Sequence, residues 1–364
     1  MKDSKITVRD AVHENIELNS LEAQVLDSKP MQRLRYVRQL SLTYLVYPSA
    51  LHTRFEHSLG TFHLTSQLVG ENFGGEQAQL LRLYALLHDV GHPAFSHLSE
   101  PILEKRFKKS HEQMGADIIR RSEISDILSK HGYSSKELLS LASKPAGKVV
   151  SGGFGTDRID YLLRDAYFTG VAYSLIDAQR LLRSLLFKGN ELVLSEKGFL
   201  AAESLMVSRY LMFSAVYNQK AVRIASAMLL KALDKAVDAR EISAEDVAQG
   251  TDDALLSSLS RDSLISMILH RRLFKSVFRF KESPADLERT LSSKFNASEF
   301  VVCPPVSKAE RFDIKVAPSG GKPYSFYAKS KLAPAIADSA EKDVIVASGA
   351  NIARELELEC RKLA

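Results

Sequence analysis

The chain has 364 residues, enough for one large domain with a smaller one appended, and its 45% apolar and 26% charged residues are typical of a globular protein. The net charge of +5 suits an anionic ligand but does not by itself indicate a nucleic-acid-binding protein. The sequence contains neither an apolar run of the roughly 20 residues that span a bilayer nor a signal-peptide core. Two cysteines, Cys303 and Cys360, are too few for a disulfide framework and lack zinc-binding spacing, so we expect a cytoplasmic protein.

The first two thirds of the chain have mainly helical patterns. An extended segment at residues 5–8 precedes a helical pattern over 21–40 that Pro30 interrupts. Ser110 and Gln113 form a capping-box pattern at the start of another helix. Further helical patterns cover 80–87, 98–107, 156–165, 196–233 and 241–278.

The last part of the chain changes character near residue 296. Strand-like segments at 300–303, 312–316, 324–327 and 344–347 are separated by Pro, Gly and Ser, and an amphipathic helix at 351–363 follows. The predicted fold is therefore mainly α, with a helical core in residues 1–240 and a C-terminal region in 241–364 that is helical and then α+β.

The strongest chemical signal is the stretch LLRLYALLHDVGHPAFSH at residues 80–97. His88 and Asp89 end an apolar helix, and His92 and His97 lie in the turn beyond it. Imidazole and carboxylate groups side by side suit a divalent metal. An isolated His-Asp pair could equally be a core histidine beside a turn residue, but the two further histidines favour a functional site.

Two other segments carry ionisable groups with a regular spacing. In LHTRFEHSLG, Arg54 lies three residues before His57 and offers the planar donor set that phosphoryl oxygens need. In the helix over 156–165, Asp157, Tyr161 and Asp165 share one face. Taken alone, this helix could instead present a solvated face with an Asp160–Arg164 ion pair.

His57, the His88–Asp89 pair and Asp157 follow one another as an H…HD…D signature. In this signature the sequence resembles the HD-domain superfamily of metal-dependent phosphohydrolases. It is most similar to the branch of deoxynucleoside triphosphate triphosphohydrolases, which includes dGTPases. The motifs that carry the resemblance lie in roughly residues 20–235 and are QRLRYVRQL, YPSALHTRFEHSLG, LLHDVGHPAFSH, SHEQMG, DRIDYLLRD and RYLMFSAVYNQK.

The resemblance implies a role for each matching residue. The implied metal ligands are His57, His88, Asp89 and Asp157. The groups implied around the α-phosphate and the attacked bond are His92, His111, Arg54 and His97. The implied substrate contacts are Gln39, Leu40, Arg158, Tyr161, Asp165, Arg209 and Tyr217. The chain departs from the family at Arg158, where Lys is commoner, and at Asn218, where Gln is commoner.

The activity implied by the resemblance is metal-dependent hydrolysis of deoxynucleoside triphosphates to deoxynucleoside and tripolyphosphate, by an HD-domain helical core. The implied cofactor is a divalent ion such as Fe, Mn or Mg, and the implied assembly is a homo-oligomer, a dimer or tetramer. Neither a membrane nor a nucleic acid is implied as a partner. Two alternatives remain open: a metal-dependent nucleotidase or phosphodiesterase with another phosphorylated nucleotide as substrate, and a catalytically silent nucleotide-binding scaffold.

Overall fold

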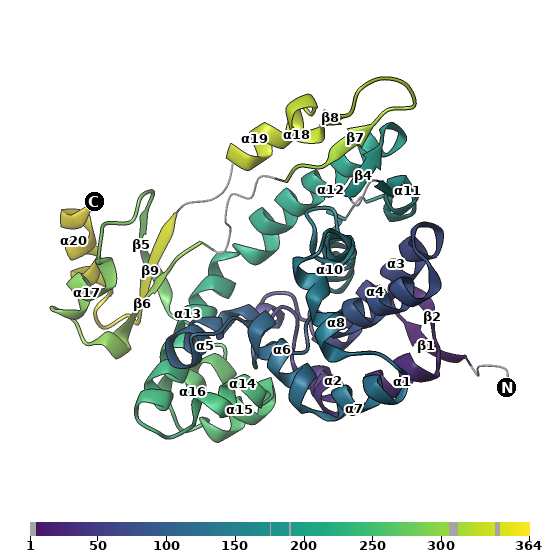
Figure 1. The fold of residues 1–364 in the computed structure, drawn as a ribbon. Helices are drawn as coiled ribbons and strands as arrows, with labels where there is room; N and C mark the ends of the chain where they lie inside the picture. The colour runs from purple at the N-terminus through teal and green to yellow at the C-terminus, as the bar shows by residue number, and fades with distance from the viewer. Residues whose placement is uncertain (1–4, 175, 189–190, 306–311, 339–342) are drawn as a thin grey trace.

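The chain begins with a hairpin and continues as a helical body (Figure 1). The computed structural model describes residues 5–174, 176–188, 191–305, 312–338 and 343–364. Strands β1 (Ile6–Asp10) and β2 (Glu14–Leu18) pair antiparallel, which confirms the predicted extended segment. The helices that follow are α1 (Ser20–Leu26), α2 (Lys29–Arg33), α3 (Arg54–Asn72), α4 (Gly75–Leu87), α5 (Glu100–Phe107), α6 (His111–Arg121), α7 (Glu123–Lys130), α8 (Ser135–Ser140), α9 (Lys148–Ser151) and α10 (Thr156–Thr169).

Local sequence signals explain where these helices begin. Pro30 lies in the first turn of α2, where its missing N–H costs nothing, so the predicted break separates α1 from α2. Ser110 and Gln113 form the predicted capping box at the start of α6.

The middle of the chain packs against this helical body. It comprises α11 (Ala178–Ser184), strands β3 (Leu185–Lys188) and β4 (Glu191–Ser195), α12 (Phe199–Met212) and α13 (Lys220–Asp238), with α11 in contact with α3 and α12 in contact with α10. The predicted continuous helix over 196–233 is wrong in one respect, because a π-helical segment at Phe213–Tyr217 follows α12 and the chain leaves the helix at Asn218. By length and composition alone Glu196–Tyr217 could cross a membrane; in the structure α12 packs against α10 and α19, and 39% of the apolar window is buried.

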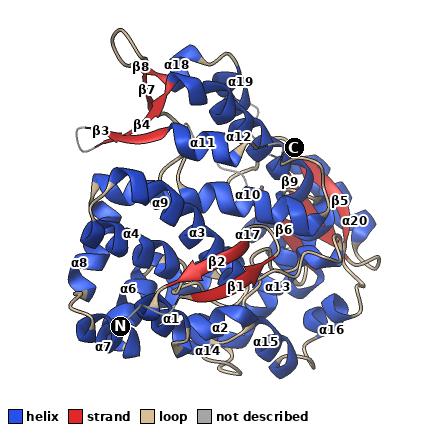
Figure 2. Ribbon diagram, turned by 90° about the vertical axis from the view of Figure 1, so that its right-hand side faces the viewer, coloured by secondary structure: helices blue, strands red, loops and turns tan. Residues whose placement is uncertain are grey.

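The C-terminal part contains short helices and strands, which Figure 2 shows in small groups on a helical molecule. Its elements are α14 (Ala244–Gln249), α15 (Asp252–Ser258), α16 (Ser263–Leu269), β5 (Lys275–Phe280), α17 (Leu287–Ser292), β6 (Phe300–Cys303), β7 (Lys315–Ala317), β8 (Tyr324–Ser325), α18 (Phe326–Lys329), α19 (Leu332–Asp338), β9 (Val344–Ser348) and α20 (Ala353–Leu363). One sheet has the order β5-β9-β6, and another has the order β3-β4-β7-β8, with β4 and β7 parallel.

Two predictions for this part are corrected. The helical pattern over 241–278 ends before β5, whose residues pair with β9. The segment 324–327 is a strand only at its first two residues, because the Ser325 side chain caps α18 by accepting the N–H of Ala328. The mainly α fold class is confirmed.

The hydrophobic cores connect the two predicted halves. The core around α3, α4 and α10 includes Val316 and Phe326, and the core around α13 includes Phe95 from the turn that follows α4. In addition, the buried carboxylate of Asp252 accepts the backbone N–H groups of Phe95, at 2.7 Å, and Arg38, at 3.0 Å. Residues beyond 240 therefore support the loops that carry the candidate site.

Candidate metal centre and catalytic site

Three packed helices bring the four predicted metal ligands together. His57 lies in the first turn of α3, His88 and Asp89 end α4, and Asp157 lies in the first turn of α10. His57 Nε2 lies 3.1 Å from Asp157 Oδ1 and 3.6 Å from Asp89 Oδ2. His88 Nε2 lies 3.3 Å from Asp89 Oδ1 and 3.9 Å from Asp157 Oδ1. Two imidazoles and two carboxylates thus face one point.

The donor set fits a divalent cation. His57, His88 and Asp157 offer ligand atoms that all lie within 4.8 Å of one another. His88 donates through Nδ1 to the carbonyl of Ala85, while its Nε2 is buried and has no hydrogen-bond partner among the described residues. Burial lowers the pKa of His57, but hydrogen bonds to Asp157 and Asp160 outweigh this and raise it to about 10. In the metal-free protein a proton on His57 therefore offsets part of the negative charge of these carboxylates. A bound cation would displace that proton.

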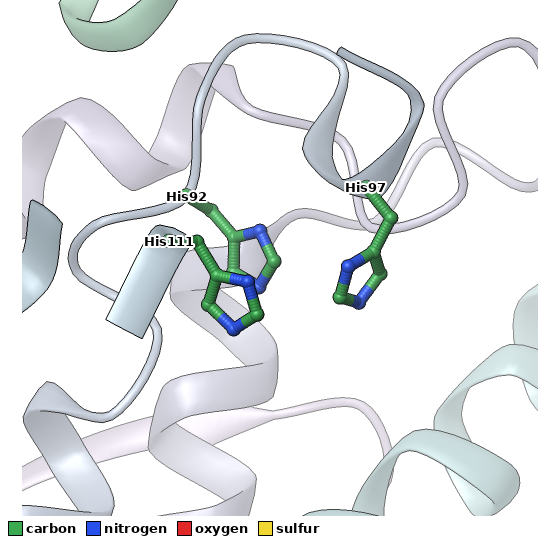
Figure 3. A group of neighbouring side chains, drawn as sticks. All are labelled: His92, His97 and His111. Atoms are coloured by element: carbon green, nitrogen blue, oxygen red, sulfur yellow. The ribbon is translucent and has the colours of Figure 1, made fainter. Parts of the chain in front are cut away.

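A second cluster lies in the turn after α4 and at the start of α6 (Figure 3). The rings of His92 and His111 stack with centroids 3.9 Å apart, and His97 meets His92 edge-on at 4.6 Å. The Glu100 carboxylate accepts from His97 Nδ1 at 2.8 Å and also from His111 Nδ1. These three histidines also have nitrogens within 4.8 Å of one another.

Gly91 allows the turn to reach α6. A β-carbon at Gly91 would lie 2.1 Å from the backbone nitrogen of Gly115 and 2.2 Å from the carbonyl oxygen of His111. Only glycine permits this approach. The contact places His92, one residue later, against His111.

The two stacked histidines have pKa values shifted in opposite directions. Burial, together with the charge of Arg54, holds the pKa of His92 well below its ordinary value. Burial also opposes charge on His111, but the hydrogen bond to Glu100 raises the pKa of His111 above its ordinary value. Adjacent titratable groups whose environments separate their pKa values are an arrangement suited to general acid–base chemistry.

The Glu100–His111 pair predicts a pH-dependent stability. Burial raises the pKa of Glu100, but hydrogen bonds from His111 and His97 lower it below 4.5, so this contribution is present above pH 4.5 and is lost as pH falls. The contribution of His111 is full below pH 6.5 and is lost as pH rises through its raised pKa. We expect Glu100→Gln to lower the free energy of unfolding by on the order of 1–2 kcal/mol between about pH 4.5 and 6.5, and by less near pH 9. Urea unfolding at pH 5.5 and 9 measures this difference, and an equal loss at both would contradict it.

Arg54 has a defined partner in the structure. Its side chain is buried, donates to Asp89 Oδ2 at 2.7 Å and donates to Ser96 Oγ at 2.9 Å. The guanidinium thereby orients a predicted metal ligand. Its implied role at the α-phosphate stays a prediction.

Two of the implied substrate contacts, Tyr217 and Asp165, hydrogen-bond each other. Tyr217 donates its hydroxyl to Asp165 Oδ2 at 2.5 Å, and His52 Nε2 lies 2.8 Å from Oδ1. Burial and the Asp165 charge hold the pKa of Tyr217 well above 10, which keeps the hydroxyl protonated. Tyr161 lies one helical turn from both Asp157 and Asp165 on α10, and burial raises the pKa of its hydroxyl.

Gln39 and Leu40 lie on the loop that precedes α3. The side-chain oxygen of Gln39 is buried with no hydrogen-bond partner among the described residues. Leu40 packs, half-buried, against the core around α3, α4 and α10. A buried amide oxygen of this kind can accept a hydrogen bond from a ligand.

Arg158 and Arg209 meet at an aromatic ring from the C-terminal part. The guanidinium carbon of Arg158 lies 4.0 Å from the centroid of the Phe312 ring, and that of Arg209 lies 4.8 Å from it. Sequence analysis assigned no chemistry to this region, and Phe312 shows no motif that would have pointed to the site.

Sequence reasoning also missed the supporting residues. Asp160 and Arg164 do form the ion pair considered above, but both are fully buried, so the solvated-face alternative is wrong. Asp10 and His13, which contact this pair, were not identified. Glu100 could have been found from its position three residues after His97, where a helical turn brings the two together.

Comparisons with known proteins identify two family models in the chain. The HD domain model matches residues 54–151, and the HD associated region model matches residues 176–299. An uncharacterized protein from Methanocaldococcus jannaschii is 40% identical over 281 residues, covering 75% of this chain and 59% of that protein. A deoxynucleoside triphosphate triphosphohydrolase SAMHD1 homolog from Dictyostelium discoideum is 26% identical over 310 residues, covering 76% and 59%. The chain thus spans about three fifths of the length of these curated relatives.

A solved structure matches over nearly the whole chain. The crystal structure of a hypothetical protein from Aquifex aeolicus superposes with a TM-score of 0.81 at 31% identity. The match covers 98% of this chain and 100% of that protein. The architecture described above, including the C-terminal part, is therefore shared with a relative.

Proposed function

This chain belongs to the HD-domain superfamily of metal-dependent phosphohydrolases, and from that premise we propose that it hydrolyses deoxynucleoside triphosphates to deoxynucleoside and tripolyphosphate. The observation that carries the proposal is the position of the stacked His92–His111 pair, which adjoins the four-ligand set through Asp89, 3.3 Å from His92 Nε2. An acid–base pair beside a metal site suits phosphoryl-bond hydrolysis.

The residues around this centre favour a nucleotide triphosphate. Two arginines, Arg158 and Arg209, supply cationic donors for phosphoryl oxygens. Arg158 is on α10, as Asp165 is, and Arg209 is on α12, which packs against α10; both guanidiniums contact the ring of Phe312. Asp165 accepts a sugar hydroxyl on this proposal. The distant relative named a deoxynucleoside triphosphate triphosphohydrolase adds support for this substrate class.

Each group has one task in the proposed reaction. His57, His88, Asp89 and Asp157 would hold a divalent ion, which would supply Lewis acidity and lower the pKa of a water molecule. His111 gives its proton to the departing 5′ oxygen as the bond between that oxygen and the α-phosphorus breaks. Arg158 and Arg209 bind the phosphoryl oxygens before the reaction begins.

The experiment that tests this function identifies the products and the bond that breaks. Protein loaded with Mn²⁺ is incubated in water enriched in ¹⁸O with each of the deoxynucleoside and ribonucleoside triphosphates. We expect deoxynucleoside and tripolyphosphate, with the label in tripolyphosphate because water attacks phosphorus. Size-exclusion chromatography of the same protein, with light-scattering detection, tests the expected homo-oligomer.

Other outcomes of this experiment select the alternatives. Release of orthophosphate would favour a nucleotidase that uses the same ligand set; a phosphodiesterase releases none and is tested by adding a cyclic nucleotide. Tight nucleotide binding without turnover with Fe²⁺, Mn²⁺ or Mg²⁺ would favour a silent nucleotide-binding scaffold. Either result would reject the triphosphohydrolase proposal.

A further inference from the structure

The turn of the N-terminal hairpin reaches the supporting side of the metal site. His13 is the last residue of the turn between β1 and β2, and its side chain is only 8% exposed. Its Nε2 lies 2.6 Å from Oδ1 of Asp160, a carboxylate in α10 that is fully buried. A residue far from the family motifs thus contacts the helix that carries Asp157.

The same carboxylate holds a predicted metal ligand. Asp160 Oδ2 lies 2.7 Å from His57 Nδ1, while His57 Nε2 faces Asp157 and Asp89. A carboxylate that accepts from Nδ1 fixes the proton there and leaves the Nε2 lone pair for the metal. Asp160 therefore selects both the tautomer and the ring orientation of His57.

The remaining acceptor sites of Asp160 are also filled. Arg164 donates to it from Nε, at 3.0 Å, and from Nη2, at 3.1 Å. With the two histidines, four donors meet a group that has about four lone-pair sites. A β-carbon at Gly60 would lie 1.8 Å from Asp160 Oδ1, so glycine at that position is needed for the carboxylate to reach His57.

Asp10 anchors the turn that carries His13. Its carboxylate accepts from Arg164 Nη1 at 2.8 Å, and it accepts the backbone N–H groups of Val12, at 2.9 Å, and His13, at 2.8 Å. The turn is thus fixed to Arg164, the arginine that also holds Asp160.

From these contacts we propose that His13 is a positioning residue for the metal site, acting through Asp160 on His57. The hairpin is then part of the metal centre and does more than cover the helical body. The inference rests on the proposed function, because it takes His57 as a metal ligand. It adds a residue outside the HD domain match, which begins at residue 54.

The test is the affinity for Mn²⁺, measured on the full chain by electron paramagnetic resonance of the free ion. Outer-shell partners of metal histidines contribute about 10- to 100-fold in affinity. Since His13 acts one contact further out, through Asp160, we expect His13→Ala to weaken Mn²⁺ binding by the lower end of that range, about tenfold. In His13→Gln the amide nitrogen can donate from nearly the same place, so affinity should recover to within about threefold of the parent.

His63→Ala is the matched control. The His63 ring stacks on that of His13 at 5.2 Å but hydrogen-bonds Gln67 and not Asp160. The Mn²⁺ affinity of His63→Ala should stay within about twofold of that of the parent protein. Urea unfolding of each metal-free variant separates a weakened site from a destabilised fold, since the proposal requires a loss of affinity beyond any loss of folded protein.

The outcomes distinguish the two proposals. If the parent binds no Mn²⁺, the metal site itself and this inference both fail. If the parent binds Mn²⁺ and hydrolyses its substrate but His13→Ala binds as tightly, only the positioning role of His13 is overturned. A weakened site in His13→Ala with recovery in His13→Gln supports it.

Discussion

The double substitution His88→Ala with Asp89→Ala is expected to abolish metal binding and to lower hydrolysis by at least about 10³-fold. These side chains are two of the four predicted ligands: His88 clusters with His57 and Asp157, and Asp89 lies 3.3 Å from His88 and pairs with Arg54 at 2.7 Å. Losing both leaves one histidine and one aspartate, too few to hold a divalent ion firmly. Metal content per protein, by elemental analysis, and the rate of deoxynucleoside release measure the two effects.

An exposed aspartate and an exposed histidine outside the site provide the control for this substitution. Asp126 lies in the first turn of α7 and His131 caps its C-terminal end, and both contribute to none of the contacts described above. Replacing both by alanine should leave metal content and rate unchanged. Full activity in the variant that lacks His88 and Asp89 would refute the assigned metal ligands.

Arg164→Met is expected to cost about 3–5 kcal/mol of unfolding free energy, because it leaves two buried carboxylates without their shared cation. The guanidinium is fully buried and bonds both Asp10 and Asp160. Methionine conserves much of the side-chain volume, so the loss reports charge rather than a cavity. Urea unfolding at neutral pH measures the effect.

An exposed arginine provides the comparison. Arg361 pairs with Glu357 on the surface of α20, and its side chain is 64% exposed. Solvent-exposed ion pairs contribute little, so Arg361→Ala should change stability by no more than about 0.5 kcal/mol. If both substitutions lowered the free energy of unfolding equally, the buried ion pairs would contribute no more to stability than an exposed one.

The sequence predicted the clustered histidines and aspartates of the candidate site better than the residues that support them. His57, His88, Asp89 and Asp157 are recognisable because their order and spacing form one signature. The helix carrying Asp157 was also predicted, since α10 covers the whole segment 156–165. These features are local, and periodicity or a motif reports them directly.

Long-range contacts account for most of what was missed. Asp160 and Arg164 looked like a solvated pair because nothing near them in sequence shows that Asp10 and His13 fold over them. Phe312 belongs to a strand-like segment with no chemical signal, and only the tertiary fold brings it to Arg158. The strand β5 was predicted as helix because its pairing with β9 overrides the local pattern.

The π-helical segment Phe213–Tyr217 restricts how the chain can change in length at this point. Removing a residue from a helix rotates everything that follows it about the axis, by about 100° in an α-helix. Deleting one residue between Arg209 and Tyr217 would therefore turn the tyrosine away from Asp165. Substitutions in this segment leave that angle intact, whereas insertions and deletions do not. Relatives with the same hydroxyl–carboxylate contact should therefore vary here in composition and keep a constant number of residues.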